Sequence, residues 1–164
     1  MTPTAEVIME TPAGLLLVGG GHEAVTHIRF VGGAPPRAAA PARAAAGRGL
    51  PAPVRSAVRQ LEEYFAGRRR RFDLPLRLEG TPFQRAVWAF LLTIPYGRAY
   101  TYGEVAAALG KPGASRAVGA AVGRNPVSIV VPCHRVVAAG GRPGGYGGGL
   151  DAKLFLLHLE GIRL

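Results

Sequence analysis

Residues 32–53 consist almost entirely of alanine, glycine, proline and arginine, with scarcely a large apolar side chain. Such a segment can bury little apolar surface, so burial cannot offset the conformational entropy that would be lost if the segment became ordered. It is therefore expected to be a long, mobile surface loop, and the core must come from the residues before and after it. A chain of 164 residues is long enough to bury that core as one compact domain or as two small ones.

The residues before the alanine-rich segment predict a small sheet. Residues 14–18 and 26–31 are apolar runs that suit β-strands, and Gly19, Gly20 and Gly21 separate them. Two such runs around a glycine-rich turn are typical of a hairpin or meander.

The residues after that segment predict a helix and then an extended stretch. One apolar face at helical spacing is formed by Val54, Val58, Leu61 and Phe65, and Gly67 is a typical stop. The arginines at 68–71 are interpreted as a solvated edge, with DNA contact as the alternative. Residues 72–78 predict one more strand or an extended linker. A boundary near residues 79–81 is expected, which divides the chain into residues 1–79 and 80–164.

Beyond this boundary the pattern predicts helices. Thr81, Pro82 and Gln84 supply a capping residue, a first-turn proline and a box-closing glutamine for an amphipathic helix that runs to Ile94.

Two shorter helices should follow. Thr101 and Glu104 repeat the capping box, so a helix is expected to about residue 109. A second helix at residues 114–123 should end before Pro126, because the residue before a proline is pushed out of helical geometry. The pair resembles a helix-turn-helix.

The second of these helices is unusual for a helix that reads DNA bases. Only the side chains of Arg116 and Arg124 are long enough to reach into DNA. The other residues that could face the DNA are small: Ala117, Gly119, Ala120, Ala121 and Gly123. A helix without base-edge donors and acceptors cannot specify sequence. Small residues would let the backbone approach a groove closely while one long cation enters the base stack. They would equally allow tight packing against another helix.

The overall charge is compatible with a polyanionic partner. The formal charge of +10 comes from 20 lysines and arginines against 10 acids, and composition bias would also produce it. A single cysteine cannot form an internal disulfide, no signal peptide is recognisable, and no apolar run approaches membrane-spanning length. A soluble protein of the cytoplasm is expected. The four histidines lack the partners and spacing of a metal site, so neither metal nor cofactor is expected.

The strongest chemical candidate is the lone cysteine. An apolar run at residues 128–131, expected to be extended, stops at Pro132 and then presents Cys133 and His134. A thiol needs a nearby base to become a nucleophile, although a lone cysteine can also be a small buried hydrophobe. Side chains of neighbouring residues in a strand point to opposite faces, so a turn or a bridging water is needed. Glu160 could orient the imidazole or be mere surface charge.

The stretch Pro132-Cys133-His134-Arg135-Val136 resembles the active-site motif of the O6-alkylguanine-DNA alkyltransferases, also called methylated-DNA–protein-cysteine methyltransferases. The resemblance to the family is close from residue 81 to the end of the sequence. Before residue 81 it extends only to the general order of strands and helix. Further motifs stand in the family's order: Ile94-Pro95-Tyr96-Gly97, Thr101-Tyr102-Gly103-Glu104-Val105-Ala106, Arg116-Ala117-Val118-Gly119, Arg124-Asn125-Pro126, Gly145-Tyr146-Gly147-Gly148-Gly149-Leu150 and Lys153.

This resemblance implies an α+β fold of two small domains. The N-terminal one would be a ribonuclease-H-like α/β domain, and the C-terminal one mostly helical and winged-helix-like, with the helix-turn-helix.

The resemblance also implies roles for individual residues. Cys133 would accept the alkyl group, His134 would act as a base through water, and Glu160 would fix the histidine. Tyr102 would donate to the purine and help to displace the nucleotide. The substrate pocket would include Val136, Tyr146, Gly147 and Lys153, and DNA would be bound by Arg116, Ala117, Arg124 and Asn125.

Within that assignment, Arg116 would fill the space that the flipped nucleotide vacates, and Asn125 would brace the turn before the active-site segment. Gly147 departs from the serine that many members carry, so any hydroxyl contribution is lost there.

The implied reaction is the irreversible transfer of an alkyl group from O6-alkylguanine in double-stranded DNA to Cys133, once per molecule, by a monomer. A cysteine hydrolase, a transcription regulator and a non-catalytic lesion binder are the competing readings. The sequence leaves open the preferred adduct size, activity on O4-alkylthymine, and cooperative binding to DNA.

Overall fold

The computed structural model describes residues 4–32, 43–44 and 49–164, which form two compact units, Met1–Leu78 and Glu79–Leu164. Most of the loop predicted at residues 32–53 lies outside the described residues. Its described part contains strand β4 (Arg43–Ala44) and the start of helix α1 (Ala52–Phe65), so the segment is not a loop throughout.

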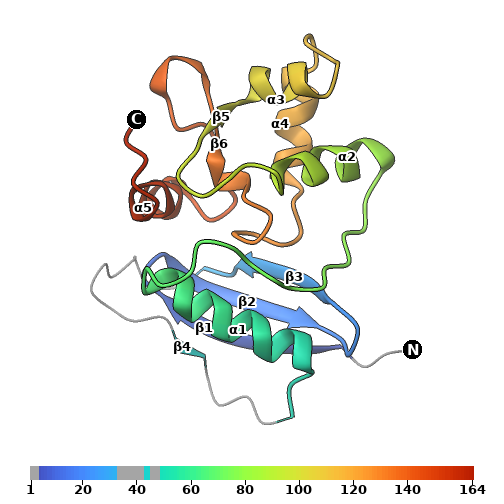
Figure 1. The fold of residues 1–164 in the computed structure, drawn as a ribbon, viewed down its shortest axis with the longest axis vertical. Helices are drawn as coiled ribbons and strands as arrows, with labels where there is room; N and C mark the ends of the chain where they lie inside the picture. Colours follow the sequence, from blue (N-terminus) through green and yellow to red (C-terminus); the bar gives the residue numbers. More distant parts are fainter. Residues whose placement is uncertain (1–3, 33–42, 45–48) are drawn as a thin grey trace. The chain divides into compact units, whose positions relative to one another are not determined.

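The first unit contains an antiparallel sheet in the order β3-β2-β1-β4 (Figure 1). Strands β2 (Gly14–Gly20) and β3 (Val25–Phe30) confirm the two predicted runs, whereas β1 (Ala5–Thr11) was not predicted. The turn predicted at Gly19–Gly21 was misplaced. Gly19 and Gly20 belong to β2, and the turn is closed by the Gly21 N–H donating to the Ala24 carbonyl at 3.0 Å.

Helix α1 packs on one face of this sheet, as Figure 1 shows. Burial of a large apolar side chain contributes about 1.5–3 kcal/mol, so this two-layer core is the main support of the unit. Its buried residues include Val7, Met9, Leu16, Val18 and Ile28 of the sheet and Val54, Ala57, Val58, Leu61 and Tyr64 of the helix.

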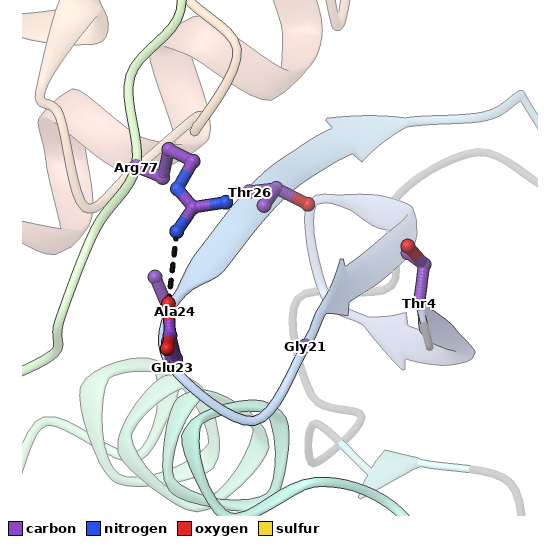
Figure 2. Close-up of a pocket in the computed structure, with 6 residues that line it drawn as sticks. All are labelled: Thr4, Gly21, Glu23, Ala24, Thr26 and Arg77. Atoms are coloured by element: carbon purple, nitrogen blue, oxygen red, sulfur yellow. Dashed lines mark hydrogen bonds and ion pairs between the residues drawn. The ribbon is translucent and has the colours of Figure 1, made fainter. Parts of the chain in front are cut away.

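Residues 72–78 are an extended segment with one bridge to the sheet. The Val25 N–H donates to the Pro75 carbonyl at 2.8 Å, and the Arg77 N–H donates to the Val25 carbonyl at 3.0 Å. Figure 2 shows a small polar hollow at this crossing, where Arg77 and Glu23 form an exposed ion pair at 3.1 Å. The hollow contains none of the predicted site residues.

The second unit is mainly helical. Two capping boxes begin α2 (Pro82–Leu91) at Thr81 and α3 (Tyr102–Ala108) at Thr101, as predicted. Helix α2 ends three residues before the predicted Ile94, because Ile94 precedes a proline and is disfavoured in helical geometry. Helix α5 (Leu150–Leu159) closes the unit. Among the described residues no helix is long and apolar enough to cross a membrane.

The predicted helix pair is present. Helix α3 packs against α4 (Ser115–Gly123), and the buried indole N–H of Trp88 donates to the Ala121 carbonyl at 2.8 Å, which ties α2 to α4. A two-residue parallel ladder joins β5 (Tyr100–Thr101) to β6 (Val136–Val137), with Tyr100 opposite Val136.

The extended run predicted at residues 128–131 was wrong. The chain turns there, with the Val131 N–H donating to the Val127 carbonyl at 3.0 Å and the buried Ile129 at a φ of 73°. This left-handed conformation is unfavourable for a β-branched residue, so the surrounding packing must impose it. Asn125 braces the turn from both sides, because its amide donates to the Val131 carbonyl and accepts from the Val127 N–H.

We expect Thr81→Val to lower the free energy of unfolding by about 1 kcal/mol, because it removes the hydroxyl that accepts from the Gln84 N–H at the start of α2. Thr81→Ser keeps the hydroxyl and is the matched control. Urea unfolding followed by circular dichroism measures both, and equal stability of the two variants would contradict the capping role.

Candidate active site

Cys133 opens a single 3-10 turn, η1 (Cys133–Arg135), directly after Pro132. The turn removes the strand geometry that would send the Cys133 and His134 side chains to opposite faces. Cys133 is 6% exposed and His134 is fully buried, so the thiol lies at the edge of the interior rather than on an open surface.

Glu160, the C-cap residue of α5, fixes the orientation of His134. The imidazole Nε2 lies 2.6 Å from Glu160 Oε2, and both side chains are buried. Because a carboxylate can only accept, the neutral ring carries its proton on Nε2 and its lone pair on Nδ1. That Nδ1 is buried without a hydrogen-bond partner among the described residues. The arrangement leaves a nitrogen that can act as a base on the residue that follows Cys133 in the turn.

Arg135 completes the network, although the sequence analysis assigned it no role. Its Nε donates to Glu160 Oε1 at 2.8 Å, its Nη2 donates to Oε2 at 3.1 Å, and its Nη1 donates to the Ile94 carbonyl at 2.6 Å. The Gly97 N–H also donates to Glu160, at 3.1 Å. One buried carboxylate therefore connects α5, the η1 turn and the segment after α2.

These contacts decide which groups carry charge. Burial by itself raises the pKa of Glu160, but hydrogen bonds from His134 and Arg135 outweigh it and hold that pKa far below its usual range. Burial lowers the pKa of His134 despite the opposing effect of Glu160, so the imidazole is neutral near pH 7.

Burial also raises the pKa of Cys133, against the opposing effects of a hydrogen bond from Asn125 and the charge of Lys153. The resting sulfur is therefore a thiol. It must lose its proton during the reaction, and the free lone pair of His134 is suited to accept it.

Lys153, which is predicted to belong to the substrate pocket, lies on α5 and is fully buried. Its ammonium donates to the Val136 carbonyl at 2.7 Å and to the Gly145 carbonyl at 3.0 Å. Burial lowers its pKa to about 8. Lys153 thus connects strand β6 to the glycine-rich loop at residues 140–149 and positions this side of the site.

The glycine-rich loop lies against Tyr102, the first residue of α3. A Cβ at Gly144, whose φ is 77°, would stand 2.8 Å from the Tyr102 hydroxyl, so glycine permits the close approach. Tyr146 buries its hydroxyl close to Cys133, and burial raises the pKa of that phenol well above its usual value. At Gly147 an added Cβ would meet nothing within 4 Å, so the space there is open.

Helix α4 presents part of its set of small residues to solvent. Arg116, Ala117, Ala120 and Arg124 are exposed, whereas Val118 and Ala121 are buried. Ala120 lies three residues after Ala117 and four residues from both Arg116 and Arg124, so these exposed residues share one helix face. For these residues the alternative of packing against another helix does not hold within the described part of the chain.

Comparison with known proteins matches both units. The model of the 6-O-methylguanine DNA methyltransferase ribonuclease-like domain matches residues 6–78, and that of the DNA binding domain matches residues 82–162. A methylated-DNA–protein-cysteine methyltransferase of Methanosarcina acetivorans is 47% identical, covering 94% of this chain and 96% of its own. One from Mycolicibacterium paratuberculosis is 48% identical, covering 93% and 89%. A crystal structure of Mycobacterium tuberculosis OGT in complex with DNA has a TM-score of 0.78 at 44% identity, covering 93% and 90%.

We expect acid to destabilise the fold through Glu160. A carboxyl whose pKa is lower in the folded than in the unfolded chain stabilises the fold above its usual pKa, and this stabilisation is lost as the pH falls below it. The free energy of unfolding should therefore fall between about pH 5 and pH 3.

Glu160→Gln should show a flatter pH profile and lower stability at neutral pH, because Arg135 loses its partner. Glu79→Gln, at an exposed position, is the control and should keep the wild-type profile. Urea unfolding across this pH range measures all three, and parallel profiles for wild type and Glu160→Gln would contradict the assignment.

Proposed function

This chain belongs to the 6-O-methylguanine DNA methyltransferase family, and on that premise we propose that it repairs DNA by moving the alkyl group of O6-alkylguanine to Cys133. The observation that carries the proposal is the neutral His134 in the turn that Cys133 opens, oriented by Glu160 and with a buried Nδ1 that has no hydrogen-bond partner among the described residues. A thiol with an oriented base is suited to displacement at a soft alkyl carbon.

The proposed reaction is an in-line displacement. A bond forms between the sulfur and the alkyl carbon while the bond between that carbon and guanine O6 breaks. The thiol proton moves through a water molecule to His134 Nδ1, and the electron pair of the broken bond stays on guanine. A hydrogen bond from the Tyr102 hydroxyl to the purine stabilises the charge that develops there.

The substrate class follows from where the lesion lies. An alkylated base inside a duplex must be rotated out before a protein thiol can align with it. The exposed small face of α4 allows a close approach to the DNA, and Arg116 is the side chain with the reach to fill the vacated space. Arg124 supplies a further phosphate contact, and neither contact requires a particular sequence.

The stoichiometry follows from the product. A thioether has no labile acyl or phosphoryl bond for water to cleave, and Cys133 is the only cysteine of the chain. We therefore propose that each molecule reacts once, as a monomer in the cytoplasm, where a reducing environment keeps the thiol available.

Mixing the protein with an excess of duplex DNA that contains O6-methylguanine should add one methyl group per chain, because no second acceptor thiol is present. Intact-mass spectrometry measures the addition, and peptide mapping should locate it at Cys133. Cys133→Ser should gain nothing. Repeated turnover without a mass change would instead indicate a hydrolase.

Tyr102→Phe should slow methyl transfer about 100-fold, because it removes the donor that stabilises the departing guanine. Tyr100→Phe, two residues away, is the matched control and should keep the wild-type rate. Single-turnover kinetics with saturating duplex measures the chemical step, so weaker DNA binding cannot imitate the effect. Equal rates for the two variants would remove Tyr102 from the mechanism.

A further inference from the structure

A four-arginine loop at residues 68–71 follows helix α1 in the first unit, outside the site described above. The helix ends in a Schellman motif, in which the Arg68 N–H donates to the Glu63 carbonyl at 2.9 Å and the Gly67 N–H donates to the Tyr64 carbonyl at 3.0 Å. Gly67 has a φ of 75°, so the chain leaves the helix at a fixed angle.

The arginine loop is held at both ends. Arg69 folds back, with its Nη1 donating to the Arg71 carbonyl at 2.8 Å and its Nη2 lying 3.6 Å from Glu63. Just beyond the loop, the Gln60 side-chain amide exchanges two hydrogen bonds of 2.9 Å with the backbone of Asp73. Gln60 is only 3% exposed, so it belongs to the core. The loop is thus a built element rather than a loose tail.

This geometry concentrates positive charge. Arg68, Arg70 and Arg71 are exposed, while Arg69 is used inside the loop. Consecutive Cα atoms are at most about 3.8 Å apart, so the loop spans no more than about 11 Å. Cations favour the C-terminus of a helix, but that effect is confined to the last turn and does not require three exposed arginines. Like charges held this close repel one another, and a polyanion would relieve the repulsion.

We propose that the arginine loop binds the phosphate backbone of duplex DNA, as a contact surface additional to the exposed face of α4. Duplex DNA carries one phosphate charge per about 1.7 Å of helix axis, so several phosphates fall within the length of the loop. Arginine is suited to this contact because its planar guanidinium binds phosphate oxygens in pairs. The inference rests on the proposed function, because it takes DNA as the partner.

The test replaces Arg68, Arg70 and Arg71 together by serine and leaves Arg69 in place. Fluorescence anisotropy measures the dissociation constant for a long undamaged duplex as the salt concentration is raised. Each phosphate contact contributes about 0.9 to the slope of log K against log salt, so the slope should become shallower by about 2 to 3. A variant with lysine at the same three positions should keep most of the slope.

The matched control replaces three exposed arginines outside the loop by serine: Arg29, Arg55 and Arg163. This variant loses the same charge as the loop variant. The control should keep the wild-type slope. An unchanged slope in the loop variant would overturn the proposal, and so would an equal loss in the control, which would indicate net charge alone. Binding of polyglutamate by the wild type but not by the loop variant, with an unchanged DNA slope, would assign the loop to an acidic protein instead.

Methyl uptake measured on the same samples separates this inference from the proposed function. Absence of transfer by the wild type would overturn the proposed function. Normal transfer with an unchanged salt slope would overturn only the role of the arginine loop. At saturating DNA the loop variant should still gain one methyl group.

Discussion

The carboxylate of Glu160 is the contact on which the rest of the site depends. It accepts hydrogen bonds from His134, Arg135 and the Gly97 N–H, and all of this takes place in the protein interior. A buried charge is tolerated only when it is paired and its lone pairs are used, which is the case here. Because the carboxylate is saturated, the imidazole has one orientation and one tautomer. The chemistry proposed for Cys133 requires both.

Much of the second unit could be predicted because its signals are local. The capping boxes at Thr81 and Thr101 fixed the starts of two helices, since a cap is decided by four consecutive residues. The same holds for strand β2, whose apolar run is continuous, and for strand β3, which is rich in β-branched and aromatic residues. Strand β1 was missed because its apolar run, Val7 to Met9, is only three residues long and lies between Glu6 and Glu10.

The site could be predicted only where a motif marked it. Arg135 stood in the motif, but nothing in the sequence reveals that its guanidinium would reach a carboxylate 25 residues away. Lys153 was predicted from its motif to belong to the substrate pocket, but nothing in the sequence reveals that its ammonium donates to two backbone carbonyls. The turn at residues 128–131 looked extended because β-branched residues favour strands, and tertiary packing overrode that preference at Ile129.

The short parallel ladder between β5 and β6 has a consequence for how such proteins can vary. It places the start of the helix that carries Tyr102 next to the residues that follow Cys133, through two paired positions. Insertions or deletions in the connection at residues 109–114 leave that spacing untouched, so this connection can change length at little cost to the chemistry. A slip of the ladder by a single residue would turn its side chains to the opposite face.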